Sequence, residues 1–110
     1  KREDELVDFN KTSLEIYNKI RGLNPFPVAY ATLDGKVMKL YASSIKDNVY
    51  TSKRNGEIVR VYSDGIGVST RDSEIVITEI KPEGKRKMSV KEYLNGIDKE
   101  SLVGKVFNGE

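Results

Sequence analysis

The sequence predicts a mainly β protein: an antiparallel barrel of about five or six short strands, with one helix before the barrel and one short helix after it. Three observations predict this class. Short runs rich in β-branched and aromatic residues follow one another between residues 28 and 80. Asp-Gly and Asp-Ser pairs, which are typical of tight turns, separate several of these runs. Before and after the runs, apolar residues recur at helical spacing instead.

The first helix is predicted to begin near residue 12. Thr12 and Glu15 have the spacing of a capping box, in which a hydroxyl and a carboxylate each accept a hydrogen bond from a free backbone N–H. Asn10 is the alternative cap. An apolar stripe follows at helical spacing, formed by Leu14, Tyr17 and Ile20.

The end of this helix carries strong stop signals. Gly22 is predicted to adopt a left-handed conformation that ends the helix, and the segment 24–27, Asn-Pro-Phe-Pro, cannot continue it. We interpret this string as a rigid turn, with Phe26 buried between the two prolines, that fixes how the helix docks on the barrel. Such a turn needs no ligand to explain it.

The strands are predicted from their composition and from the turns between them. Asp34-Gly35, Asp64-Gly65 and Asp72-Ser73 each connect two runs as a hairpin turn. A meander of this kind resembles an OB-type barrel, closed or partly closed, rather than a parallel sheet. The predicted strands are 28–33, 36–45, 57–63, 66–71 and 74–80.

A second short helix is predicted after the barrel. Ser89 and Glu92 repeat the capping-box spacing, and Gly96 is the predicted stop. The tail beyond is apolar enough for one more short strand or a packed extension, through Leu102, Val103, Val106 and Phe107.

Composition disfavours several functions. At 110 residues the chain is long enough for one domain with a modest core. It contains no cysteine, so it has no disulfide framework and no thiolate metal site, and a reducing cytoplasm fits. It contains no histidine, the commonest near-neutral general base and metal ligand. No apolar run approaches the roughly 20 residues that a membrane span needs. We therefore expect no catalytic residue, metal or membrane partner in this chain.

The net charge of +2 is unevenly placed. The first fifteen residues hold five acids and three bases, whereas the remaining 95 hold twelve acids and 16 bases. Clustered positive charge is what binding to a polyanion such as RNA requires, although any one cluster can equally be a solvated surface. The candidate RNA-binding residues fall in segments 36–60 and 81–91: Lys36, Lys39, Lys46, Lys53, Arg54, Arg60, Lys85, Arg86, Lys87 and Lys91.

Two of these candidates have specific neighbours. The run 85–87, Lys-Arg-Lys, directly precedes the second helix, where free N–H groups add positive potential that suits phosphate; the alternative is pairing with acids. Lys39 and Tyr41 share a strand face, which would place a cation beside an aromatic ring, but we favour Tyr41 as a core residue. Lys36 is expected to leave the strand pattern beside the turn.

Several strings together resemble the carboxy-terminal domain of the methionyl-tRNA formyltransferase family. They occur in the family's order over roughly residues 8–107. The chain departs from the family at Phe26, where tryptophan is usual, and at Val28, where glycine is frequent. The matching strings are 8–11 with Ile16, 20–27, 33–36, 64–65, 78–89 and the helix 90–96.

This resemblance implies a division of labour. The family's enzyme transfers a formyl group from 10-formyltetrahydrofolate to methionine on initiator tRNA, with its Asn, His and Asp catalytic residues and a Ser-Leu-Leu-Pro loop in an amino-terminal domain. None of these motifs is present here. The resemblance therefore implies that residues 10–110 form an OB-like accessory domain that holds tRNA through non-specific phosphate contacts. It also implies that residues 1–9 are the remnant of an interdomain linker.

The same resemblance sets the remaining expectations. The cofactor, 10-formyltetrahydrofolate, is expected on the amino-terminal catalytic domain and not in this chain. That catalytic domain is also an expected partner. The parent protein is expected to be cytoplasmic and monomeric. Two alternatives stay open. One is the matching domain of a related sugar-nucleotide formyltransferase or formyltetrahydrofolate hydrolase. The other is a purely structural docking domain whose lysines are incidental.

Overall fold

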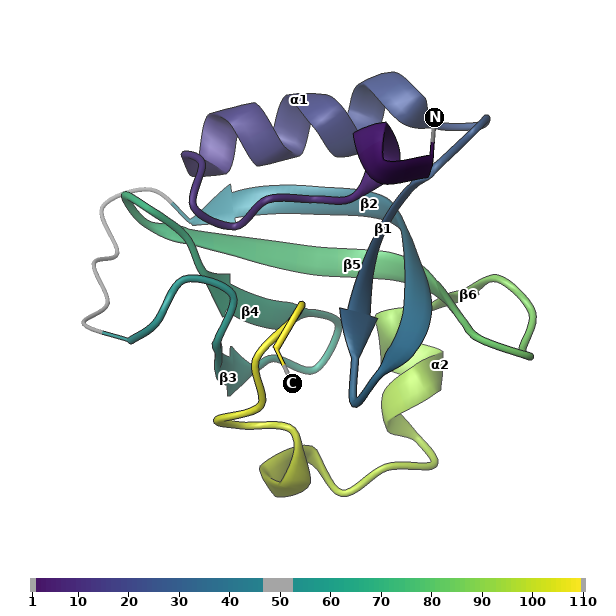
Figure 1. Cartoon of the computed structure of the whole chain (residues 1–110). Coiled ribbons are helices and arrows are strands. Elements are labelled where there is room, and N and C mark those ends of the chain that lie inside the picture. Colours follow the sequence, from purple (N-terminus) through teal and green to yellow (C-terminus); the bar gives the residue numbers. More distant parts are fainter. Residues whose placement is uncertain (1, 47–52, 110) are drawn as a thin grey trace.

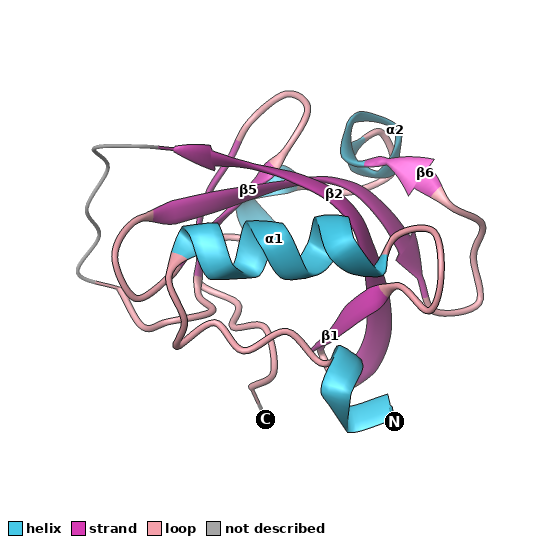
Figure 2. Ribbon diagram, turned by 90° about the horizontal axis from the view of Figure 1, so that it is seen from above, coloured by secondary structure: helices cyan, strands magenta, loops and turns pink. Residues whose placement is uncertain are grey.

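A single, strongly curved antiparallel sheet forms the body of the molecule in the computed structural model, which describes residues 2–46 and 53–109 (Figure 1). The strand order is β1-β2-β5-β4-β3, and β6 pairs with β5. Helix α1 lies across β2 and β5, as the view from above shows (Figure 2). The elements are η1 (Arg2–Glu5), α1 (Ser13–Leu23), β1 (Ala29–Leu33), β2 (Lys36–Lys46), β3 (Ile58–Val61), β4 (Ile66–Ser69), β5 (Glu74–Pro82), β6 (Met88–Ser89), α2 (Val90–Leu94) and η2 (Lys99–Ser101).

The predicted fold class is confirmed: the molecule is mainly β and antiparallel, with a helix before the sheet and a short helix after it. The predicted hairpins form, and Asp34 and Gly35 both adopt the positive φ angles, 54° and 77°, that a tight hairpin turn requires. The prediction of a simple meander is wrong, because β2 pairs with β5 rather than with β3. The strand order begins with β1 and finishes with β3, so these two strands are the edges of the sheet and the sheet is not closed into a ring.

The carboxy-terminal tail connects these two edges. It bonds to β3 through Ile58, whose N–H donates to the Lys105 carbonyl at 2.8 Å and whose carbonyl accepts from the Gly104 N–H at 2.8 Å. It bonds to β1 through Thr32, whose carbonyl accepts from the Asn108 N–H at 2.8 Å and whose N–H donates to Asn108 Oδ1 at 3.0 Å. Of the two predicted alternatives for the tail, the packed extension is therefore the one that forms.

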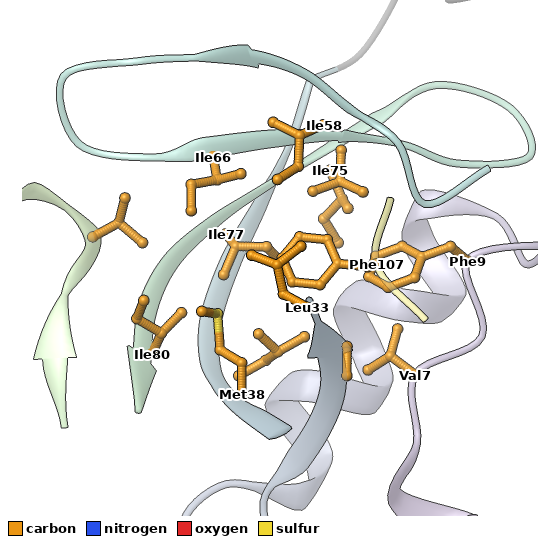
Figure 3. Close-up of a cluster of buried hydrophobic side chains, with 14 of the residues drawn as sticks. Val7, Phe9, Leu33, Met38, Ile58, Ile66, Ile75, Ile77, Ile80 and Phe107 are labelled. Atoms are coloured by element: carbon orange, nitrogen blue, oxygen red, sulfur yellow. The ribbon is translucent and has the colours of Figure 1, made fainter. Parts of the chain in front are cut away.

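The core combines residues from the two α-helices, the strands and the segments before and after them. Buried isoleucines from β3, β4 and β5 gather in the centre of the molecule (Figure 3). Ile16 and Ile20 from α1 belong to the same cluster. Phe9 stacks on Phe107 from the tail, with ring centres 5.6 Å apart. Val7 is also fully buried, and its N–H donates to the Tyr30 carbonyl at 2.8 Å. The end of segment 1–9 thus packs into the same core as the strands.

The start of α1 matches the sequence prediction, whereas its end does not. The capping box forms in both directions: Thr12 Oγ1 accepts the Glu15 N–H and the Glu15 carboxylate accepts the Thr12 N–H. The helix runs through Gly22 to Leu23, and Gly22 does not adopt a positive φ, so the predicted glycine stop is wrong. The proline segment ends the helix instead, because its extended backbone cannot continue the hydrogen-bond ladder.

Phe26 also departs from expectation. It was predicted to be buried between two prolines, but its side chain is 86% exposed. The Val28 N–H donates to the Leu23 carbonyl at 2.8 Å, which closes the loop tightly and leaves Phe26 at the tip.

The second helix, α2, forms half of its predicted capping box. Ser89 Oγ accepts the Glu92 N–H at 3.1 Å, but the Glu92 carboxylate binds Arg86 instead of the cap backbone. The helix ends at Leu94 with Asn95 as its carboxy-terminal cap, directly before the predicted stop residue Gly96, which does not adopt a positive φ. Within residues 2–46 and 53–109, no helix has both the length and the apolar character needed to cross a membrane.

Candidate nucleic-acid interface

The outer face of β1, β2 and β5 carries two lysines in direct register. Lys39 of β2 lies opposite Lys81 of β5 on one side and opposite Tyr30 of β1 on the other. Residues directly opposite in an antiparallel pair point to the same face, so these three side chains lie side by side. Met38 and Leu40, the neighbours of Lys39, are buried on the other face. In the described part of the chain neither lysine has an acidic partner, so their charges are uncompensated.

Lys87 extends this positive surface from the segment that precedes α2. Its Nζ lies 4.6 Å from the centre of the Tyr41 ring and 3.7 Å from Glu79 Oε1. The prediction that Tyr41 belongs to the core is wrong: it follows the buried Leu40 on the opposite, outer face and is half-buried there. From the sequence we considered a contact between Lys39 and the Tyr41 ring. In the structure Lys87 makes this contact instead. We call Lys39, Lys81 and Lys87, with Tyr30 and Tyr41, the lysine face.

Sequence reasoning missed two contributors to this surface. Lys81 was visible as one charge of the 81–91 cluster but was not chosen as a candidate, since only the β2–β5 register places it beside Lys39. Arg2 lies in the segment interpreted as linker, yet its Cζ lies 4.8 Å from the centre of the Tyr30 ring. No local signal in the sequence predicts either contact, because both join segments far apart along the chain.

Of the three basic residues before α2, Arg86 and Lys87 pair with acids, which is the alternative that the sequence left open. Arg86 makes a charged hydrogen bond with Glu92, which places a negative charge in the first turn of the helix. The helix has only five residues, too few for a substantial dipole. Lys85 and Lys91 are exposed, and no ion pair to either is seen among the described residues. Of this run, Lys87 alone joins the lysine face.

Two other candidates, Lys46 and Arg60, lie at the far end of the sheet around a buried carboxylate. Glu74 is fully buried, with its Oε1 3.4 Å from Arg60 Nε and its Oε2 accepting a 2.9 Å hydrogen bond from the Tyr62 hydroxyl. Lys46 Nζ lies 4.9 Å from the centre of the Tyr62 ring. Burial, and then the hydrogen bond to Glu74, raise the pKa of Tyr62. These two bases are engaged in holding the sheet together.

The remaining candidates lie apart from the lysine face. Arg54 pairs with Glu57 in the approach to β3, with Nε 3.2 Å from Oε1. Lys53 directly follows residues 47–52, which lie outside the described part of the chain. Lys36 is exposed at the start of β2, beside the turn, as predicted. Among the described residues, the two basic segments therefore converge where 36–41 meets 81–87, through the pairing of β2 with β5.

This arrangement suits the neutralisation of a polyanion rather than bond-making chemistry. Apart from Glu79, which pairs with Lys87, its charged groups are the ammonium groups of the lysines and the guanidinium group of Arg2. Such groups bind phosphate oxygens by charge and hydrogen bonding. In residues 2–46 and 53–109, no group of three or more acidic side chains is placed to hold a metal ion.

Comparison with known proteins decides the family. The sequence profile of the family described as "Formyl transferase, C-terminal domain" matches residues 1–98. The chain belongs to this family. The resemblance drawn from the sequence is confirmed.

Similar curated proteins carry the name methionyl-tRNA formyltransferase. The one from Macrococcus caseolyticus is 44% identical over 107 residues, which is 97% of this chain and 33% of that protein. The one from Bacillus subtilis is 42% identical over 102 residues, and the one from Bacillus thuringiensis is 46% identical over 101 residues. Each alignment covers more than nine-tenths of this chain but about a third of the relative, 32% in both Bacillus proteins.

Solved structures show the same fold at lower identity. HypX from Aquifex aeolicus in complex with tetrahydrofolic acid superposes with a TM-score of 0.65 at 19% identity, covering 88% of this chain and 18% of HypX. A HypX variant superposes over 90% of the chain with the same TM-score. This likeness concerns the fold alone.

Proposed function

We propose that this domain holds tRNA for a methionyl-tRNA formyltransferase through phosphate contacts made by the lysine face. The relatives that match over nearly the whole chain carry that name. The observation that supports the RNA-facing role is the register of Lys39 with Lys81. Like charges directly opposite on a sheet are destabilising, on the order of 0.2–1 kcal/mol, and a bound polyanion relieves that repulsion.

The contacts are proposed to be to phosphate rather than to bases. The rings of Tyr30 and Tyr41 already contact a cation each, Arg2 and Lys87, so they present charge as well as a ring face. Phosphate contacts position a nucleic acid without reading its sequence. With a net charge of +2, the isolated domain is expected to bind tRNA weakly, at about 10⁻⁴–10⁻⁶ M or worse at physiological salt.

Formyl transfer itself is proposed to occur on the rest of the parent protein. The chain spans about a third of its curated relatives, 33% of the Macrococcus caseolyticus protein. It has no histidine, so the catalytic histidine implied by the resemblance must come from another part of the parent. We likewise assign 10-formyltetrahydrofolate to that part, and expect a monomeric, cytoplasmic enzyme.

A salt titration of tRNA binding tests the proposal. Binding of the 110-residue chain is compared with that of a Lys39→Gln, Lys81→Gln double variant. If each lysine contacts one phosphate, the slope of log K against log salt becomes shallower by about 0.7–0.9 for each. The matched control, Lys11→Gln with Lys99→Gln, removes the same charge elsewhere and is expected to change the slope much less. Salt-independent binding, or equal losses in both double variants, would contradict the proposal.

The alternatives give different outcomes in the full-length parent. The sequence leaves a related formyl-transfer enzyme open, so the parent is assayed with Met-tRNA, with an amino-sugar nucleotide, and for hydrolysis of formyltetrahydrofolate. A purely structural role predicts that omitting the domain lowers stability but leaves the KM for tRNA unchanged. Our proposal predicts a higher KM for tRNA.

A further inference from the structure

The loop between α1 and β1 exposes an unusually apolar tip. Phe26 is 86% exposed, more than Leu14 at 58% and Val103 at 45%, the other large hydrophobic side chains exposed in the described residues. Its neighbours Pro25 and Pro27 add apolar surface, since Pro25 is exposed and Pro27 half-buried. A single exposed hydrophobic residue needs no explanation, but an aromatic ring framed by two prolines forms a continuous apolar knob.

This tip is held in place by the rest of the domain. The Val28 N–H donates to the Leu23 carbonyl at 2.8 Å, across the base of the loop. Asn24 Nδ2 donates to the Tyr41 carbonyl at 3.0 Å, which ties the loop to β2. The two prolines fix their own φ angles. A ring presented on such a loop loses little conformational freedom when it binds, which favours its use as an anchor.

The amino-terminal segment of the chain lies at the same end of the molecule as this loop. Leu6 pairs with Tyr30 at the start of β1, and Lys19 Nζ on α1 donates to the Leu6 carbonyl at 2.9 Å. Figures 1 and 2 both place the N-terminus toward the end of α1 that leads into the Phe26 loop. In the curated relatives about two-thirds of the protein lies outside the matched segment, and the matched family is a carboxy-terminal domain.

We propose that Phe26 is the anchor by which this domain docks on the polypeptide that precedes it in the parent protein. Central aromatic residues that enter an apolar pocket carry much of the energy of protein–protein interfaces. RNA is a less suitable occupant. The cation–ring contacts in the described part of the chain all involve tyrosines (Tyr17, Tyr30, Tyr41 and Tyr62), and the residues on either side of Phe26 in the chain are uncharged prolines. The proposal does not depend on the tRNA-binding role.

Hydroxyl-radical footprinting read by mass spectrometry tests the docking without any substitution. Oxidation of Phe26 is measured in the 110-residue chain and in the full-length parent, each with and without tRNA. We expect the rate to fall roughly five-fold or more in the parent without tRNA, because an anchor residue is largely desolvated. Leu14 and Val103 serve as internal controls and are expected to change much less. Unchanged oxidation of Phe26 in the parent would overturn the proposal, and so would protection that requires tRNA.

A variant separates docking from RNA binding. Phe26→Ala in the parent is expected to speed proteolytic cleavage near residues 1–5 several-fold, because the undocked domain exposes that segment; Val103→Ala is the matched control. In the isolated chain, Phe26→Ala is expected to leave tRNA affinity unchanged. An unchanged cleavage rate, or a loss of tRNA affinity, would refute the anchor role. Failure of the lysine-face variants to affect tRNA binding would leave these results intact.

Discussion

Gly67 on β4 lies directly over the buried carboxylate of Glu74 on β5. A Cβ atom on Gly67 would overlap Glu74 Oε2 and come within 3.2 Å of the Arg60 carbonyl oxygen. The absence of a side chain at this position thus makes room for the carboxylate, which the Tyr62 hydroxyl and the Arg60 guanidinium contact. Two of the predicted RNA-binding residues, Lys46 and Arg60, are placed by this cluster.

Replacing Gly67 by alanine is expected to destabilise the fold by about 1–3 kcal/mol, because the methyl group must displace a packed, hydrogen-bonded carboxylate or the neighbouring backbone. Urea unfolding measures the change. Gly22→Ala is the control: it lies inside α1, and beyond the helix's own backbone no atom lies within 4 Å of the position that its Cβ would take. Alanine there is expected to stabilise by roughly 0.5–1 kcal/mol. Equal effects of the two substitutions would contradict the crowding at Gly67.

Asn108 is expected to be essential for joining the two edges of the sheet. Its Oδ1 accepts the Thr32 N–H, and its Nδ2 donates to the Val7 carbonyl at 2.7 Å. Its φ of 62° suits asparagine or glycine better than alanine. Asn108→Ala should therefore cost about 1–3 kcal/mol, through lost hydrogen bonds and backbone strain together.

Asn108→Gly separates these two causes. Glycine removes the side-chain bonds but adopts the positive φ without cost, so it should destabilise less than alanine. Hydrogen exchange reports the same bridge, and the Thr32 amide should exchange faster in both variants. If the Thr32 amide stays as protected as in the parent sequence, the tail does not bridge the two edges.

Local signals in the sequence predicted the local parts of the fold. The Thr12–Glu15 capping box and the Asp34-Gly35 turn depend on residues within four positions of one another, and both form as expected. The pairing of β2 with β5 brings together residues between 28 positions (Lys46 and Glu74) and 44 positions (Met38 and Pro82) apart, and periodicity cannot specify it. For the same reason the lysine face could not be foreseen, since Lys39 and Lys81 are neighbours only through that pairing.

The errors in burial have a similar cause. Tyr41 and Phe26 were both expected to be buried because aromatic residues usually fill cores. Tyr41 lies on the outer face of β2. Phe26 lies at the tip of a loop whose base is closed by the hydrogen bond from Val28 to Leu23. Residue type alone could not show this, because exposure depends on which face or loop carries the ring.

The stability of the domain should depend on the ionisation of Asp72. Its Oδ1 accepts the N–H of Ser13 at the start of α1 at 3.0 Å, and that bond holds the pKa of the Asp72 carboxyl below its ordinary value of 3.8. A carboxyl whose pKa is lower in the folded than in the unfolded state stabilises the fold at any pH above its unfolded-state pKa. This contribution is lost as the pH falls through its folded-state pKa.

The stability advantage of the unmodified chain over Asp72→Asn should therefore be complete at neutral pH and shrink as the pH falls below about 4. Thermal unfolding between pH 7 and pH 3 measures it. Asp64→Asn, at an exposed turn without a hydrogen-bond partner in the described chain, is the control. A difference between the unmodified chain and Asp72→Asn that grows on acidification would have the wrong sign and would exclude this mechanism.

Lys39→Glu should change stability and RNA binding in opposite directions. The substitution replaces the repulsion between Lys39 and Lys81 by an attractive cross-strand pair, worth about 0.2–1 kcal/mol of added stability. It also places a negative charge in the middle of the lysine face, so tRNA affinity should fall. Lys99→Glu makes the same change in net charge on an exposed residue of η2, away from the sheet, and should not raise stability. The gain in stability and the loss of tRNA affinity both arise from Lys39 and Lys81. A Lys39→Glu variant that is more stable yet binds tRNA as tightly as the unmodified chain would therefore show that the lysine face does not contact the RNA.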